Sequence, residues 1–295
     1  MNTCPLLTVI TPTYNRAYTL TKAYASMCRQ TNKDFIWLVV DDGSTDNTEE
    51  VISSWKNDGL IEIEYLKKEN GGKASALNVA FDHITTPYCV CLDSDDYFTD
   101  NAVELSLKLL DEEKDNEKCC GVLALHRTTD GGFFGGKDLD PSIKYISVPE
   151  IHLDTEYARF YKMSALSNVR FPEFPGEKFV SPVFIDFLLA KKYKFRVTHE
   201  SFCICEYMDD GLTKNKRKVI VKNPKGYTAV KRFSYAYSST ARDKVKNGIM
   251  YCCGCIVGRD KDWLKNAPYK VLTVLLWPLG YVAYIRRFKN ISQNN

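Results

Sequence analysis

Three aspartates fall within four positions of the chain, directly after a short apolar segment: Asp93, Asp95 and Asp96 in the stretch CVCLDSDD. Ionised carboxylates a few ångströms apart repel each other by about 4 kcal/mol at an effective dielectric constant near 20. A divalent cation would cancel this repulsion, and carboxylate oxygens are ligands that suit Mg²⁺ or Mn²⁺. The alternative is a polar turn without a metal, because aspartate is also frequent in turns. Asp100, a few residues further on, is better explained as a helix cap.

The segments around this cluster predict an alternation of strands and helices. Short apolar runs at 6–11, 35–41, 60–66 and 88–93 are typical of buried strands, and apolar residues recur at helical spacing between them. Such an alternation predicts a mostly parallel sheet that is covered by helices on both faces. The fold class is therefore expected to be α/β and Rossmann-like.

Polar residues follow three of the predicted strands at the point where each strand ends. Tyr14 comes after the first strand, Asp42 after the second and Asp93 after the fourth. Ligands of parallel sheets bind beyond the carboxyl ends of the strands. We therefore expect these three side chains to line one crevice.

The remainder of the chain is less regular. Strands are predicted at 119–127 and 194–207, and a helix is predicted with Ser181 as its N-cap and Pro182 at its first position. The basic and polar segment 214–262 is predicted to be helical.

The bulk composition limits the classes of partner and compartment. A formal net charge of +3 over 295 residues is too small to indicate a nucleic-acid partner. Many of the eleven cysteines form adjacent or alternating pairs, such as Cys203 and Cys205, which lack the C-x-x-C spacing of a zinc site. We expect these cysteines to be buried thiols in a reducing cytoplasm. The opening MNTCPLLTVITP lacks the features of a signal peptide.

The segment 271–285 is almost wholly apolar, and basic residues flank it on both sides. As a helix it would be about 22 Å long, which is short against about 30 Å of hydrocarbon, and Pro278 would kink it. A core helix, a helix lying on an anionic membrane surface and a membrane span are the three alternatives. The basic flanks and the aromatic residues Trp277, Tyr281 and Tyr284 favour the helix on the membrane surface.

Four motifs occur in a characteristic order: VITPTYNR at 9–16, VVDDGSTDNT at 39–48, ENGGKASALNVAF at 69–81 and CLDSDD at 91–96. In this order and at these intervals they closely resemble the family 2 nucleotide-sugar glycosyltransferases. FPGEKFV and CEYMDDGLTKN, further along the chain, more weakly resemble a bacterial subgroup that takes part in polysaccharide assembly.

The resemblance implies a GT-A-type, Rossmann-like sheet flanked by helices, followed by a C-terminal, helical, membrane-associating extension. It divides the chain into three parts. Residues 1–118 would bind the nucleotide sugar, residues 119–215 would bind the acceptor within the same domain, and residues 216–295 would form the extension with the apolar tail.

The resemblance also implies roles for the motif residues. Pro12, Tyr14 and Asp42 would hold the nucleotide base, and Lys73 would balance phosphate charge. Asp93 would meet the ribose or the water shell of the metal, and Asp95 would ligate the metal itself.

The implied metal is Mn²⁺ or Mg²⁺, which would stabilise the departing diphosphate. Lys214, Lys216 and Arg217 are candidates for closing over that diphosphate, and a solvated basic loop is the alternative.

Inverting transfer needs a base that takes the proton of the acceptor hydroxyl. Pro182 stands where related sequences have a glutamate, and the nearest substitutes are Glu177 and Asp186. Glu177 keeps its place in the GEKFV motif and is the preferred catalytic base. Asp186 is expected on the exposed face of its helix.

The function implied is metal-assisted, inverting transfer of a sugar from a nucleoside diphosphate donor to a glycan or a lipid-linked glycan. A UDP-sugar is the preferred candidate for the donor. The apolar tail places this reaction at the inner, cytoplasmic face of the cell membrane, with the protein bound peripherally. A catalytically silent member that binds nucleotide sugar or a partner enzyme is the alternative. A sugar nucleotidyltransferase is disfavoured, because no glycine-rich basic loop follows the first strand.

Overall fold

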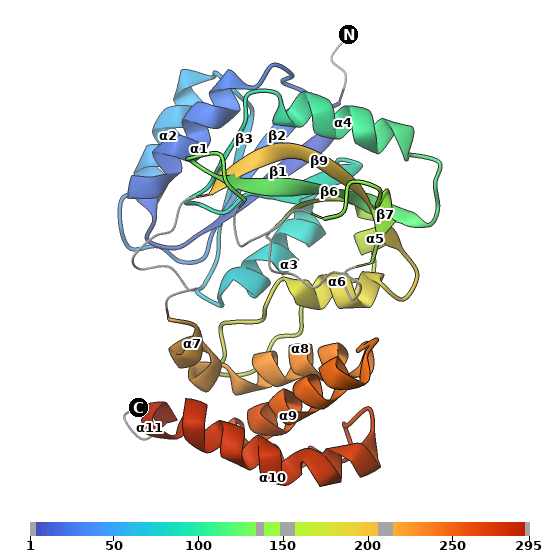
Figure 1. Cartoon of the computed structure of the whole chain (residues 1–295). Helices are drawn as coiled ribbons and strands as arrows, with labels where there is room; N and C mark the ends of the chain where they lie inside the picture. The colour runs from blue at the N-terminus through green and yellow to red at the C-terminus, as the bar shows by residue number, and fades with distance from the viewer. Residues whose placement is uncertain (1–3, 134–138, 148–156, 206–214, 293–295) are drawn as a thin grey trace. The chain divides into compact units, whose positions relative to one another are not determined.

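The computed structural model describes residues 4–133, 139–147, 157–205 and 215–292 (Figure 1). The chain divides into two compact units. The first consists of Met1–Arg170 and Leu189–Met208, and the second of Phe171–Leu188 and Asp209–Asn295.

Among the described residues, the first unit contains one sheet of nine strands, in the order β3-β2-β1-β4-β8-β6-β9-β5, with β7 paired to β9. The strands are β1 (Leu7–Thr13), β2 (Phe35–Asp41), β3 (Ile63–Lys67), β4 (Tyr88–Cys91), β5 (Tyr97–Phe98), β6 (Cys119–Thr128), β7 (Tyr145–Ile146), β8 (Tyr157–Lys162) and β9 (Lys194–Cys205). The first four strands pair in parallel, as predicted, and β8 joins β4 to β6 by antiparallel pairing on both sides. All six strands predicted from the sequence exist, as β1, β2, β3, β4, β6 and β9, whereas β5, β7 and β8 were not predicted.

Helices cover both faces of this sheet. They are α1 (Ala17–Arg29), α2 (Thr48–Asp58), α3 (Lys73–His83), α4 (Ala102–Glu112) and the short α5 (Met163–Leu166). Apolar side chains of α1, α2 and α4 share one buried core with the strands, and α3 lies on the opposite face (Figure 1). On the core side, Trp37 of β2 stacks with Tyr24 and Trp55, and its indole N–H donates to Thr11 Oγ1 at 2.9 Å. This packing fixes β2 against α1, α2 and β1.

The second unit is mostly helical in its described part, apart from residues 171–182. It contains α6 (Val183–Leu189), α7 (Lys216–Lys222), α8 (Pro224–Ala236), α9 (Ala241–Val257), α10 (Lys270–Arg287) and α11 (Lys289–Ser292). α6 begins at Val183, one residue after the predicted first position, and helices occupy most of the segment predicted to be helical. α9 and α10 can pack closely because Gly280 has no side chain. A Cβ at this position would lie 2.4 Å from the Cβ of Cys252.

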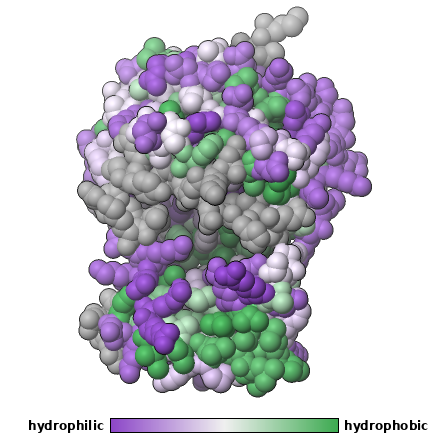
Figure 2. All heavy atoms as spheres, in the orientation of Figure 1, coloured by the Kyte–Doolittle hydropathy of each residue, from purple (hydrophilic) through white to green (hydrophobic). Residues whose placement is uncertain are grey.

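α10 packs on one side only. Thr273, Leu276 and Gly280 are buried, whereas a row of apolar residues is exposed on the outside of the helix. We call this row the outer face of α10, and it consists of Val271, Val274, Leu275, Leu279, Tyr281, Val282 and Ile285. Figure 2 shows a hydrophobic patch in the region where Figure 1 labels α10. Within the described ranges, no helix combines the length and the apolar character needed to cross a bilayer.

Candidate active site

The polar residues predicted to converge lie at the carboxyl ends of three neighbouring parallel strands. The order β2-β1-β4 places Asp42, Tyr14 and Asp93 just beyond adjacent strand ends. The loops after β1 and β2 are tied together, because the Asn15 side chain accepts from the backbone N–H of Thr45 at 2.8 Å. Tyr14 is 48% exposed beside this junction, so its ring is open to a ligand.

Asp42 organises the loop that leads into α3. Its carboxylate accepts from the backbone N–H groups of Gly71 at 2.9 Å and Gly72 at 2.6 Å, and from Lys68 Nζ at 2.9 Å. Gly72 has a φ of +90°, a conformation that side chains rarely adopt, so the loop needs glycine here. Asp42 is only 4% exposed. Its predicted contact with the nucleotide base stays a prediction, and the structure adds this second, structural role.

Lys73 is the first residue of α3, and its ammonium group donates a hydrogen bond to Asp93 Oδ1. Burial would lower the pKa of Lys73, but the charge of Asp93 outweighs this effect and the pKa is raised. Burial would likewise raise the pKa of Asp93, but the charge and the hydrogen bond of Lys73 hold it below its usual range. Both groups are therefore charged, and together they form a fixed ion pair at the strand ends.

Among the described residues, neither Asp95 nor Asp96 forms an ion pair like that of Asp93, and the charge of Lys73 only partly offsets their crowding. Burial, and then the charge of Asp93, raise the pKa of Asp95, and the same two causes raise the pKa of Asp96 to about 8. Carboxylate oxygens of Asp93, Asp95 and Asp96 lie within 4.8 Å of one another. The crowding inferred from the sequence is therefore present. A divalent cation bound by these oxygens would stabilise the ionised forms.

Three residues missed as functional candidates lie beside this cluster. His126 of β6 is close to Cys205 of β9, whose Sγ lies 3.3 Å from Nδ1 of the histidine, and Cys203 is next to Cys205. Burial, together with the charge of Arg159, lowers the pKa of His126 to about 3, so the imidazole is neutral. No local motif could have signalled this group, because its members come from separate strands.

The predicted base, Glu177, has a defined place in the second unit. One carboxylate oxygen accepts from the backbone N–H of Lys225 and the other from that of Gly226, both at 2.9 Å. These N–H groups belong to the first turn of α8, so Glu177 caps this helix and its charge favours the helix N-terminus. The assignment of Glu177 as the base stays a prediction.

Asp186 corrects one expectation. It was predicted on an exposed helix face, but it is fully buried in α6, as are its neighbours Phe184, Ile185 and Phe187. The prediction was wrong because this short helix is covered on the aspartate side as well as on its apolar side.

The basic candidates for the diphosphate are only partly described. Lys214 lies outside the described residues, whereas Lys216 and Arg217 are exposed in the first turn of α7. Their contact with a diphosphate stays a prediction.

Comparisons with known proteins agree with the motif order. The model of the family described as Glycosyl transferase family 2 matches residues 8–165, which is more than half of the chain. A protein of Rickettsia felis described as an uncharacterized glycosyltransferase is 36% identical over 140 residues, which are 44% of this chain and 22% of that protein. The hyaluronan synthase of Pasteurella multocida is 41% identical over 109 residues, which are 37% of this chain and 11% of the synthase. The matches thus span about a fifth or less of these relatives.

Two solved structures share the fold at low sequence identity. S. aureus TarS 1-349 in complex with UDP-GlcNAc has a TM-score of 0.57 at 17% identity, over 97% of this chain and 90% of that chain. Mannosyltransferase PcManGT from Pyrobaculum calidifontis, in complex with GDP-Man and Mn²⁺, has a TM-score of 0.56 at 17% identity, over 96% of this chain and 88% of that chain. The predicted GT-A-type fold is confirmed.

Proposed function

The chain belongs to glycosyl transferase family 2, and from this premise we propose that it transfers a sugar from a nucleoside diphosphate donor to a hydroxyl of a glycan or a lipid-linked glycan. The observation that carries the proposal is the group of three crowded carboxylates in the loop after β4, one of which, Asp93, forms an ion pair with Lys73. A UDP-sugar is the first candidate donor, because the TarS structure of the same fold contains UDP-GlcNAc.

The carboxylates fit a divalent cation, because hard oxygen ligands at this spacing suit Mn²⁺ or Mg²⁺. Asp95 and Asp93 would hold the ion, which when bound supplies Lewis-acid stabilisation of the leaving diphosphate. PcManGT, which shares the fold, was solved with Mn²⁺.

The protein's own groups have separate tasks in this proposal. Asp42 fixes the glycine loop through its three hydrogen bonds, so that Lys73 projects from a rigid helix start. Lys73 keeps Asp93 ionised and offsets part of the donor's phosphate charge. Tyr14 offers an exposed ring to the base, and Glu177 is the predicted acceptor of the hydroxyl proton.

We further propose that the protein works on an anionic membrane surface. The outer face of α10 is apolar and exposed, and cations lie at both ends of the helix: Lys265, Lys270, Arg286, Arg287 and Lys289. An apolar strip between basic ends suits the boundary between anionic headgroups and acyl chains. This location supports a lipid-linked acceptor.

The function can be tested on the purified full chain. Thermal stabilisation is measured with UDP-, dTDP- and GDP-sugars, with and without Mn²⁺, and release of nucleoside diphosphate is then followed with membrane extracts as acceptor. We expect stabilisation by a UDP-sugar that depends on the cation, and turnover with an extract. Stabilisation by no donor would contradict the proposal.

A second candidate is a member that binds nucleotide sugar without turning it over. The specific observation in its favour is that both oxygens of Glu177 already accept hydrogen bonds from α8, while Pro182 replaces the expected acid. Donor binding without turnover in any extract would support this candidate.

A further inference from the structure

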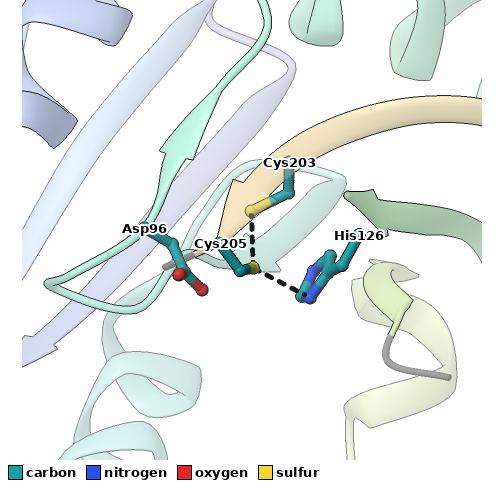
Figure 3. A group of neighbouring side chains, drawn as sticks. All are labelled: Asp96, His126, Cys203 and Cys205. Atoms are coloured by element: carbon teal, nitrogen blue, oxygen red, sulfur yellow. Dashed lines mark hydrogen bonds between the residues drawn. The ribbon is translucent and has the colours of Figure 1, made fainter. Parts of the chain in front are cut away.

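Two cysteines, a histidine and an aspartate meet at the carboxyl end of β9 (Figure 3). Cys203 and Cys205 are 1% and 3% exposed, and they lie beside His126 of β6 and Asp96 of the loop after β4. One potential ligand atom from each residue lies within 4.8 Å of all the others. The thiols are therefore not scattered core residues but part of a polar group.

Strand register explains why the four side chains meet. His126 is the direct partner of Cys203 in the parallel pairing of β6 with β9. Tyr97 is the partner of Ile204 in the antiparallel pairing of β5 with β9, so one further step places Asp96 opposite Cys205. Alternate residues of a strand point to the same face, which brings Cys203 and Cys205 together.

The distances match a tetrahedral zinc site. With Zn–S bonds of about 2.3 Å and Zn–N bonds of about 2.0–2.1 Å, tetrahedral geometry places two sulfurs about 3.8 Å apart and a sulfur and a nitrogen about 3.5 Å apart. The two Sγ atoms are 3.8 Å apart, and Cys205 Sγ lies 3.3 Å from His126 Nδ1. A disulfide would need the sulfurs at about 2.05 Å, so both cysteines are free thiols, and the same two contacts are within hydrogen-bond distance.

We propose that Cys203, Cys205, His126 and Asp96 bind a structural zinc ion. Two sulfurs, one imidazole nitrogen and one carboxylate oxygen form a complete tetrahedral set for this borderline-soft cation. The neighbouring oxygens of Asp93 and Asp95 suit a hard cation instead. The loop after β4 would thus contribute Asp96 to the zinc site and Asp93 and Asp95 to the site of the hard cation.

The zinc site would position the catalytic loop. Asp96 follows Asp95 directly, and zinc would fasten it to the ends of β6 and β9. Cys203, Cys205 and His126 are therefore positioning residues, and their effect on transfer passes through Asp96.

The test measures metal content and not activity. The full chain is purified without chelators, dialysed against zinc-free buffer and assayed for zinc by mass spectrometry. We expect one zinc ion per chain, which is released when an organic mercurial blocks the thiols. Cys203→Ser and Cys205→Ser should each lose the zinc, while Cys89→Ser, a buried thiol of β4 outside the group, should retain it.

A cobalt-substituted wild-type protein gives a second readout that does not need a variant to fold. We expect intense sulfur-to-cobalt charge-transfer absorption in the near ultraviolet, and its loss on addition of zinc. The proposal is overturned if the wild type, reconstituted with micromolar zinc, holds far less than one ion per chain. It is also overturned if folded cysteine variants keep their zinc, or if cobalt binds without sulfur bands.

The zinc proposal stands apart from the proposed function. Asp95→Asn should leave the zinc content unchanged while it strongly lowers transfer, so failure of one proposal is distinguishable from failure of the other.

Discussion

Lys73, the first residue of α3, is paired with Asp93, the first acidic residue after β4. The pair joins the glycine loop to the aspartate loop, two segments that follow different strands. It also leaves Asp95 and Asp96 as the carboxylates whose pKa is raised. Lys73 is thus already paired before any donor arrives, and in the proposed function the positive charge opposite Asp95 would come from the divalent cation.

Lys73→Met should weaken donor binding. A hydrogen bond to a charged group contributes about 1.5–3 kcal/mol, which corresponds to about 10- to 100-fold in affinity. Donor titration followed by thermal stabilisation measures this change. Lys67→Met is the matched control, because Lys67 pairs with Glu49 at an exposed position and its loss should leave donor affinity unchanged. Equal donor affinity of Lys73→Met and wild type would contradict the assigned role.

Asp95→Asn should lower transfer by about 10²–10³-fold, the loss expected when one group that stabilises developing charge is removed. Diphosphate release under saturating Mn²⁺ is the measurement. Asp100→Asn serves as control, since the described contact of its side chain is an exposed ion pair with Arg29 at 3.0 Å. The prediction that Asp100 caps the following helix was wrong, because Asn101 is the N-cap residue of α4. Removal of Mn²⁺ from the wild type by a weak chelator should reproduce the Asp95→Asn defect, and full activity of the chelated protein would refute metal assistance.

Glu177→Gln should lower transfer by about 10²–10⁴-fold if Glu177 removes the proton, as predicted. Loss of its charge at the start of α8 should also destabilise the protein by about 0.5–2 kcal/mol. Asp243→Asn provides the control for capping alone, because Asp243 lies in the first turn of α9 beside its N-cap Thr240. Both variants should lose similar stability in denaturant titrations, but only Glu177→Gln should lose transfer. A folded, active Glu177→Gln would leave Glu177 as a cap and assign the base elsewhere.

Leu275→Glu should release the protein from anionic vesicles. Leu275 is 68% exposed on the outer face of α10, and burial of a leucine side chain in lipid contributes about 1.5–3 kcal/mol, or about tenfold or more in partitioning. Co-sedimentation with phosphatidylglycerol vesicles measures binding, and phosphatidylcholine vesicles report the contribution of charge.

Leu60→Glu is the control for the membrane experiment, because Leu60 is a similarly exposed leucine, at 62%, in the first unit. It should bind vesicles like the wild type. Thermal melting should show that neither substitution affects folding, since both side chains are already exposed. If the wild-type protein does not co-sediment with anionic vesicles, the membrane proposal is contradicted.

The parts of the site that arise from single strand ends were predictable from the sequence. Asp93 and Asp95 are nearly adjacent in the chain, and the parallel order of β2, β1 and β4 puts Asp42 at the same edge of the sheet. Periodicity and the general rule for parallel sheets were sufficient for this part.

The remaining contacts depend on tertiary geometry that local patterns do not encode. The hydrogen bonds of Asp42 to Gly71 and Gly72 require the folded path of the glycine loop. The meeting of His126 with Cys203 requires the register between β6 and β9, two strands that lie far apart in the chain. Cysteine spacing alone therefore predicted only buried thiols, although the folded strands bring two of them together with His126 and Asp96.

The close contact of α9 with α10 at Gly280 bears on how the protein could rest on lipid. Because a Cβ at residue 280 would lie 2.4 Å from the Cβ of Cys252, the glycine lets α10 lie close against α9, and this contact fixes which side of α10 faces outward. If the outer face of α10 inserts into a bilayer, the orientation of this helix would set the orientation of the second unit on the membrane. Gly280→Leu should therefore change how the second unit is oriented on the membrane, although residue 280 is buried and does not contact lipid.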